Sequence, residues 1–111
     1  MGKANSGELL QGTLPLLALR LLASGPTHGF AIARRIQVIS KEVLHAEEGS
    51  LYPALHRMEL EGWIESKWGV TGNNRKAKFY KLTASGRKQL RIETERWSSI
   101  AGAVAAILAE G

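Results

Sequence analysis

A basic hairpin between two helical segments is the feature that most limits how this chain can fold. The stretch 47–62, EEGSLYPALHRMELEG, has the apolar spacing of a helix, and two aromatic-rich runs, 63–68 and 77–82, follow it with partial alternation. The intervening GVTGNNRK predicts an antiparallel hairpin with a flexible eight-residue tip. The second run leads at once into another helix, for which Thr83 is the expected N-cap.

Two further helices are expected before this unit. The segment 14–24 has a leucine stripe with Arg20 facing away, and Pro15 fits only if this helix begins near Thr13. The pattern leaves residues 9–10 either on an N-terminal arm or in an extra turn. Thr27 is the expected N-cap of a second helix, whose stripe is Ile32, Ile36 and Ile39. We thus expect a mainly α fold with a small β-hairpin, a winged helix-turn-helix followed by a long C-terminal helix.

Finer features of these elements are also predicted. Val43 and Leu44 form a short apolar piece that is expected to pair as a single edge strand. The third helix is expected to start at Gly49 or Ser50, which places Pro53 in its first turn. Its inner face is then expected to carry Leu51, Ala54, Leu55 and Met58.

Positive charge is concentrated on the hairpin and its exit. The 111-residue chain has a net charge of +5, yet basic and acidic residues balance up to residue 62. From 63 to 91 one acidic residue, Glu65, stands against eight basic ones: Lys67, Arg75, Lys76, Lys78, Lys81, Arg87, Lys88 and Arg91. A clustered basic stripe is typical of a protein that binds a polyanion, although a charge run alone is more often a solvated surface.

Composition excludes several classes of protein. The absence of cysteine excludes disulfides, thiolate zinc sites and cysteine nucleophiles, and it fits a cytoplasmic protein. The segment MGKANSGELLQG has no apolar run of signal-peptide length, and the leucine-rich segment is too short to span a bilayer. The three histidines are not spaced as paired metal ligands, aspartate is absent, and the sequence has no phosphate loop. We therefore expect no enzyme, no metal and no cofactor.

The last helix predicts a dimer. It is expected to run from Thr83 toward Ala109, about 39 Å at 1.5 Å per residue, which is longer than a domain of this size can cover. A two-fold contact uses one face twice and is the simplest way to bury its apolar stripe. The expected interface residues are Leu90, Trp97, Ile100, Ala101, Val104 and Leu108. The expected division of the chain is 1–83 for the winged helix and 84–111 for this helix.

The third helix and the hairpin tip suggest contact with duplex DNA. A major groove about 12 Å wide admits one helix, so the polar face with Tyr52, His56 and Arg57 is expected to reach base edges and phosphates. The hairpin tip would meet the DNA backbone or minor groove through Asn73, Asn74, Arg75, Lys76 and Lys78. Structural roles remain open for the helix residues, namely packing of Tyr52, a fixed first turn at Pro53, a surface histidine at His56 and an Arg57 pair with Glu61.

The tryptophans and His28 receive separate interpretations. Trp63 and Trp68 are expected in the core of the hairpin. Trp97 is expected near its symmetry mate, where it either anchors the interface or lines a flat slot for a ligand. His28, at a helix start, is expected to cap or pack.

Three segments resemble the PadR family of bacterial transcriptional regulators, in its short subgroup with one C-terminal dimerisation helix. They are ELLQGTLPLLALRLLASGPTHGFAIARRIQ, EEGSLYPALHRMELEGWIESKWG and NNRKAKFYKLTASGRKQL, and together they cover residues 8 to about 108. The resemblance implies a homodimeric repressor that binds a roughly palindromic operator and is released by a small aromatic or lipophilic ligand.

The resemblance also assigns residues by position. Those matching the recognition helix are Ser50, Tyr52, Pro53, His56 and Arg57; those matching the wing are Asn74, Arg75, Lys76 and Lys78. Trp97 matches the aromatic region used for flat ligands. Leu60, Phe79 and Lys76 depart from the usual polar residue, tyrosine and arginine, and Lys76 exchanges a bidentate fork for a point charge. The rival hypothesis is a ligand-binding or protein-interaction module on the same scaffold that does not bind an operator.

Overall fold

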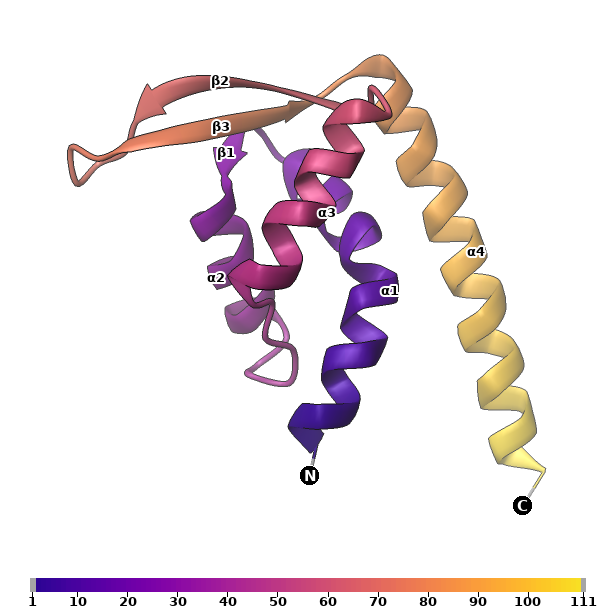
Figure 1. Ribbon diagram of the computed structural model, residues 1–111. Coiled ribbons are helices and arrows are strands. Elements are labelled where there is room, and N and C mark those ends of the chain that lie inside the picture. Colours follow the sequence, from indigo (N-terminus) through magenta and orange to yellow (C-terminus); the bar gives the residue numbers. More distant parts are fainter. Residues whose placement is uncertain (1, 111) are drawn as a thin grey trace.

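A small antiparallel sheet lies across one end of three packed helices, and a fourth helix runs down one side of them (Figure 1). The computed structural model describes the backbone of residues 2–110 and the side chains of residues 12–110. The elements are α1 (Gly2–Leu22), β1 (Thr27–His28), α2 (Gly29–Ile39), α3 (Glu48–Leu60), β2 (Ile64–Val70), β3 (Lys76–Leu82) and α4 (Ala84–Ala109). The expected fold class, a winged helix-turn-helix with a long C-terminal helix, is confirmed.

The core forms where α1, α2, α3 and the sheet meet. Leu51, Leu55 and Met58 of α3 are fully buried, and Ala54 packs against them from the edge, as the helical spacing predicts. The other buried side chains are Leu14, Ala18, Leu19, Leu21, Leu22, Ile32, Ile36, Ile64, Tyr80 and Leu82. The core therefore fixes which face of α3 remains available on the outside.

The sheet has three strands in the order β1, β3, β2, and the prediction of its edge strand is wrong. The hairpin strands pair from Ile64 with Leu82 to Val70 with Lys76, and Thr27 pairs with Tyr80. Strand β1 thus replaces the strand expected at residues 43–44.

Residues 43–44 lie instead in a turn after α2. Lys41 and Glu42 have positive φ values of 53° and 70°, which breaks an extended path. The Ser40 hydroxyl also accepts a hydrogen bond from the Leu44 amide at 3.0 Å. This side-chain bond takes the place of a strand ladder.

Three helix starts differ from expectation. Helix α3 begins at Glu48 and not at Gly49 or Ser50, so Pro53 lies inside it and beyond its first turn.

Helix α1 begins at Gly2, so Pro15 lies inside it and not in a first turn. Proline removes one intrahelical donor, and burial of the neighbouring leucines offsets that loss. The N-cap of α2 is His28 and not Thr27, because His28 Nδ1 accepts a hydrogen bond from the Ala31 amide at 3.3 Å. The expectation of a capping role for His28 is therefore confirmed.

The hairpin extends beyond the helices, and its connection is a short hydrogen-bonded turn. The connection spans residues 71–75, shorter than the expected eight. Asn74 adopts φ 62°, its amide donates to the Thr71 carbonyl at 2.9 Å, and the Thr71 hydroxyl accepts from the Arg75 amide at 3.2 Å. These bonds give the tip a defined shape.

The prediction for Trp68 is wrong, whereas that for Trp63 holds. Trp63 packs against the core. Trp68 is 63% exposed and is not among the described residues that pack against the core. The ring instead lies under the Lys76 ammonium, 5.8 Å from its centroid.

Helix α4 is tied to the hairpin at its first turn. Thr83 is its N-cap, as predicted, and the Thr83 hydroxyl accepts from the Gly86 amide at 3.0 Å and donates to the Gly62 carbonyl at 2.6 Å. The exposed large apolar side chains further along α4 are Ile92, Trp97, Ile100, Val104, Ile107 and Leu108.

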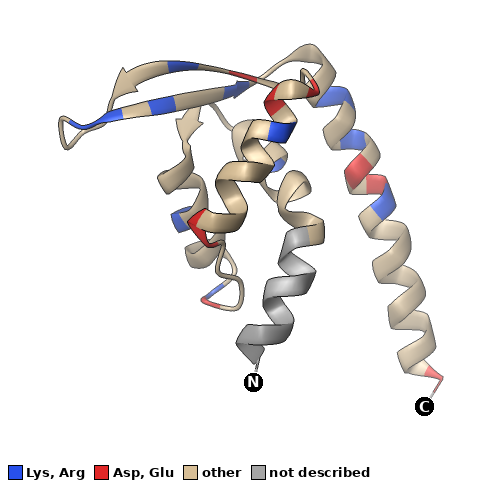
Figure 2. Ribbon diagram, viewed as in Figure 1, with Lys and Arg blue, Asp and Glu red and all other residues tan. Residues whose placement is uncertain are grey.

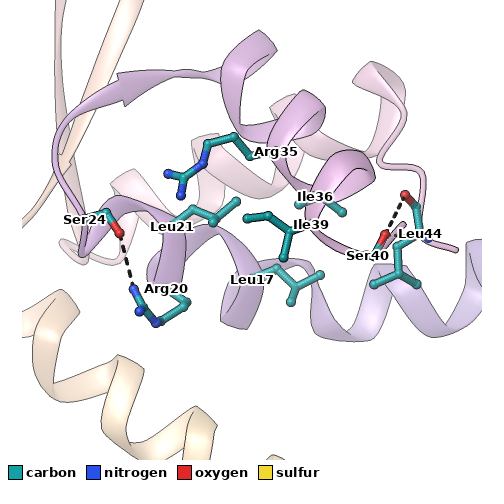
Figure 3. A pocket seen from close by; sticks show the side chains of 9 residues that line it. All are labelled: Leu17, Arg20, Leu21, Ser24, Arg35, Ile36, Ile39, Ser40 and Leu44. Atoms are coloured by element: carbon teal, nitrogen blue, oxygen red, sulfur yellow. Dashed lines mark hydrogen bonds between the residues drawn. The ribbon is translucent and has the colours of Figure 1, made fainter. Parts of the chain in front are cut away.

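A pocket of about 290 Å³ lies between α1 and α2 (Figure 3). Leu17 and Leu21 from α1 face Ile36 and Ile39 from α2 across it, with Leu44 at one end. Arg20 and Arg35 stand at its edges. Within the described chain, each helix is too short or too polar to cross a bilayer.

Candidate nucleic-acid interface

The outer face of α3 presents the side chains that the sequence predicts. Tyr52, Pro53, His56 and Arg57 are all exposed, on the side of α3 opposite the buried stripe. Ser50 lies in the first turn and is half-buried. A helix with one buried face and one polar, unobstructed face can enter a major groove without disturbing the core.

Tyr52 has both a packing role and an exposed end. Its ring lies against the backbone of Gly29, where an added Cβ would come within 2.6 Å of the ring. Burial, followed by the negative charge of Glu48, raises the pKa of Tyr52. The residue remains 41% exposed, so the neutral phenol is fixed by α2 and still reaches the surface.

A cleft of about 940 Å³ separates the inner face of the hairpin from the start of α2. Four cationic side chains line it, Arg34 from α2 and Arg75, Lys76 and Lys78 from the hairpin. None of the described residues that line the cleft is Asp or Glu. Tyr52 also lines it, which makes the cleft continuous with the outer face of α3.

Two exposed aromatic side chains stand on opposite sides of this cleft. Phe30 at the start of α2 is 61% exposed, and Trp68 on β2 is 63% exposed. Cations beside exposed aromatic rings suit a ligand that carries both phosphate groups and flat or apolar surfaces. The cleft therefore offers both cationic and aromatic side chains to a single ligand.

Sequence reasoning missed Phe30, Arg34 and Trp68 as members of the site. Phe30 and Arg34 lie off the buried stripe of α2, and this is the one signal that points to them before the fold is known. The aromatic run predicts Trp68 in the core, because nothing in the local sequence shows that its ring is exposed.

The cations of the hairpin differ in what surrounds them. Asn73, Asn74, Arg75 and Lys76 are exposed at or next to the tip, and Figure 2 shows Lys and Arg along the hairpin and the first turns of α4. Lys78 is half-buried, and its ammonium lies 3.5 Å from the Glu59 carboxylate. Lys78 therefore has an acidic partner within the fold, unlike its neighbours at the tip.

Metal-binding chemistry finds no support in the described residues. Among them, no group of three or more His, Asp or Glu side chains is placed to hold an ion. The side chains of His28, His45 and His56 have different surroundings: an N-cap, a surface turn and the outer face of α3.

The residues predicted for a dimer interface lie on α4 with unequal exposure. Trp97, Ile100 and Val104 are each about half exposed, at 48%, 51% and 50%, and Leu108 is 76% exposed. Ala101 is half-buried, and Leu90 packs against the core of its own chain. The exposed apolar surface is thus concentrated in the C-terminal half of α4.

Comparison with known proteins gives one consistent family. The chain matches the family described as "Transcriptional regulator PadR-like family" over residues 18–92. The Transcriptional regulator Rv3488 of Mycobacterium tuberculosis is 31% identical over 83 residues, which cover 75% of this chain and 74% of the relative.

Solved structures have the same fold over nearly the whole chain. A transcriptional regulator from Clostridium thermocellum superposes with a TM-score of 0.80 at 25% identity, covering 89% of this chain and 96% of its own. A PadR-like transcriptional regulator from Bacillus cereus gives a TM-score of 0.77 at 26% identity, covering 91% and 96%.

Proposed function

The chain belongs to the PadR-like family of transcriptional regulators, which are DNA-binding proteins and not enzymes, and we propose that it acts as a dimeric repressor on a roughly palindromic operator. The observation that carries this proposal is the cleft between the hairpin and α2. It is lined by cations, contains no carboxylate among its described lining residues, and opens onto the polar face of α3. Duplex DNA matches both surfaces together.

The roles of individual residues follow from their positions. We propose that α3 enters the major groove, where His56 and Arg57 reach base edges and Ser50, Tyr52 and Pro53 lie near the flanking phosphates. Contacts to base edges set which sequence is preferred.

The hairpin would contact the DNA strand beside that groove. Asn74, Arg75 and Lys76 are exposed at or next to its tip, where they meet phosphates or the minor groove. Phe30 and Trp68 flank the path of the strand through the cleft, and Arg34 meets it from α2. Contacts to phosphates set affinity and its dependence on salt.

Two copies are proposed to join through α4. Ile100, Val104, Ile107 and Leu108 leave an apolar surface on a helix that extends past the described core. A two-fold contact between two such helices removes this surface from water on both copies. On this view residues 1–83 bind DNA and residues 84–111 join the copies.

We propose repression as the direction of regulation, because a protein that occupies both grooves excludes other proteins from the same DNA. We also propose that a small aromatic or lipophilic molecule releases the protein from DNA. Trp97, half exposed on α4, and the apolar pocket between α1 and α2 (Figure 3) are the two places that suit such a molecule.

Adding a planar lipophilic dye such as anilinonaphthalene sulfonate to a preformed DNA complex tests release. The proposal expects the DNA to dissociate, and a Trp97→Ala variant shows whether that side chain takes part. If the dye saturates the protein while the DNA stays bound, release by this class of molecule is refuted.

A gel-shift titration on the DNA upstream of the protein's own gene tests DNA binding. The proposal expects a complex that survives excess unrelated DNA, and a His56→Ala variant that prefers a different sequence. Uniform weakening by His56→Ala would remove it from base readout. A wild-type protein that binds no duplex above the background of unrelated DNA would favour the rival, an interaction module without an operator.

A further inference from the structure

We propose that Glu59 is a positioning residue for DNA binding: it holds the hairpin at a fixed angle to α3, and Lys78 serves this contact and not a phosphate. The inference rests on the proposed function, since it concerns how two DNA-binding surfaces are kept in register. It gives a role to an acidic side chain on α3, the helix proposed to enter the major groove, where a negative charge would repel DNA.

The geometry consists of one carboxylate that bridges a helix to both strands of the hairpin. Glu59 lies in the last turn of α3. Its Oε2 accepts a hydrogen bond from the Ser66 hydroxyl of β2 at 2.6 Å, and its Oε1 lies 3.5 Å from the Lys78 ammonium of β3. Movement of the hairpin relative to α3 would stretch both contacts at once.

The surroundings of this bridge favour a strong interaction for a site near the surface. The side chains of Glu59 and Lys78 are 29% and 37% exposed. Tyr80 lies two positions after Lys78 on the buried face of β3 and pairs with Ser66, and its pKa is raised first by burial and then by the negative charge of Glu59. The carboxylate therefore acts at short range on the underside of the sheet, where water screens it less than on the outer face.

A second ion pair on the same hairpin provides a matched contrast. Lys81 Nζ lies 3.5 Å from Glu65 Oε1, the same separation as in the first pair. These two residues face each other across β3 and β2, are 59% and 60% exposed, and link only the two strands. Replacing Glu65 also removes one negative charge, but the contact of the hairpin with Glu59 of α3 remains.

The two possible roles of Glu59 predict opposite signs. If long-range charge alone mattered, replacing Glu59 by glutamine would remove a repulsive anion, free Lys78 for a phosphate and tighten DNA binding. If Glu59 positions the hairpin, the same change weakens binding to the preferred sequence, because α3 and the tip no longer meet their grooves in one arrangement.

The experiment compares Glu59→Gln with Glu65→Gln on the duplex that the wild-type protein selects from random sequence. We expect Glu59→Gln to weaken this binding about two- to fivefold, the range available to a partly exposed ion pair. Glu65→Gln is expected to bind at least as tightly as the wild type. Binding of both variants to unselected DNA should not weaken. Tighter binding by Glu59→Gln would overturn the proposal.

Salt dependence separates the two lysines. Lys76→Met should flatten the slope of log affinity against log salt by about 0.9, the value for one phosphate contact. Lys78→Met should weaken affinity yet leave this slope unchanged. An equal loss of slope in both variants would make Lys78 a phosphate contact and refute its assigned role.

A charge exchange guards against a folding artefact. Glu59→Lys alone is expected to weaken selective binding, and Glu59→Lys combined with Lys78→Glu, which has the wild-type net charge, is expected to recover part of it. Failure to recover in a variant with wild-type thermal stability contradicts the positioning role.

If the wild-type protein selects no DNA, the proposed function is refuted. The role of Glu59 in holding the hairpin can still be tested. Nuclear relaxation of the tip amides, residues 71–75, then reports hairpin motion directly. Order parameters should fall in Glu59→Gln and not in Glu65→Gln. Equal values in the two variants would show that Glu59 does not restrain the hairpin.

Discussion

Side chains of one type have different roles on this hairpin because their neighbours differ. Lys78 faces Glu59 and Lys81 faces Glu65, each at 3.5 Å. Arg75 and Lys76 have no carboxylate partner among the described residues, and Lys76 instead covers the Trp68 ring. The cations without acidic partners are those at the tip, where a DNA backbone would be met.

Replacing both Arg75 and Lys76 with alanine is expected to weaken binding to all DNA sequences. It should flatten the slope of log affinity against log salt by about two, since each phosphate contact contributes about 0.9. Filter binding at several salt concentrations measures this slope, with Lys81→Ala as the control on the outer face. An unchanged slope in the double variant would show that the tip does not touch phosphate.

Tyr80 predicts a loss of stability at alkaline pH. Burial, then Glu59 and Tyr52, raise its pKa above the ordinary value of 10.0. A group with a raised folded-state pKa contributes fully below its unfolded value, and this contribution is lost as the pH rises through the folded value. The free energy of unfolding should therefore fall from about pH 10 upward. Urea unfolding at pH 9 and pH 11 should show a smaller fall for Tyr80→Phe, and equal falls would contradict the shift.

Helical spacing was sufficient to predict which residues of α3 are buried and which are exposed, from Leu51 to Met58. It could not predict the Glu59 contact with Ser66 and Lys78, because those partners lie 7 and 19 positions further along the sequence. The cleft residues Phe30 and Trp68 were missed for the same reason. Their exposure depends on where one element stops covering another.

At the scale of elements, hydrogen bonds and close packing join the end of α3, the hairpin and the first turn of α4. The Thr83 amide donates to the Trp63 carbonyl at 3.1 Å, and the Thr83 hydroxyl reaches Gly62. Gly86 packs directly on this point, where an added Cβ would overlap the Trp63 carbonyl oxygen. The angle at which α4 leaves the sheet thus depends on a glycine in its first turn.

Gly86→Ala is expected to destabilise the protein by about 1–3 kcal/mol, because the backbone of Trp63 has to move to admit one methyl group. Gly12→Ala in α1 is the matched control, since an added Cβ there meets no described atom within 4 Å outside the backbone of its own helix and its two chain neighbours. That change should be neutral or stabilise by up to about 1 kcal/mol. Urea denaturation of both variants measures the difference, and equal effects would contradict the close contact at Gly86.

The order of the elements was predictable, whereas one strand pairing and the start of α1 were not. Caps, glycines and periodicity correctly indicated α2, α3, the hairpin and α4. The third strand was placed at residues 43–44 and lies at 27–28, because two residues carry too little pattern to show which strand they join. The sequence predicts that α1 begins near Thr13, because a proline is expected only in a first turn, whereas the helix begins at Gly2 and continues through Pro15.

The whole molecule has two kinds of surface in different places. The polar face of α3 and the hairpin cleft meet at Tyr52. The exposed apolar side chains of the second surface belong to α4, which runs down one side of the molecule (Figure 1). Two copies joined through α4 would present two recognition helices, which fit successive major grooves when they are about 34 Å apart. Binding to both half-sites of one operator would then require the DNA-facing surface of each copy and the contact between the two α4 helices.

Charged substitutions on α4 test this joint requirement. Val104→Glu combined with Leu108→Glu is expected to give single copies in sedimentation, because the free energy needed to bury these carboxylates exceeds the stabilisation from the apolar contact. Affinity for the selected duplex should fall, while binding to unrelated DNA changes less. A double variant that remains dimeric would move the interface away from these residues.

The most direct measurement is selection of bound duplexes from random DNA, followed by sequencing. A dimer joined through α4 is expected to select two inverted copies of one half-site with centres about 10 base pairs apart, because two α3 helices related by a two-fold axis read successive grooves. Enrichment of a single unrepeated site, or no enrichment at all, would contradict this expectation.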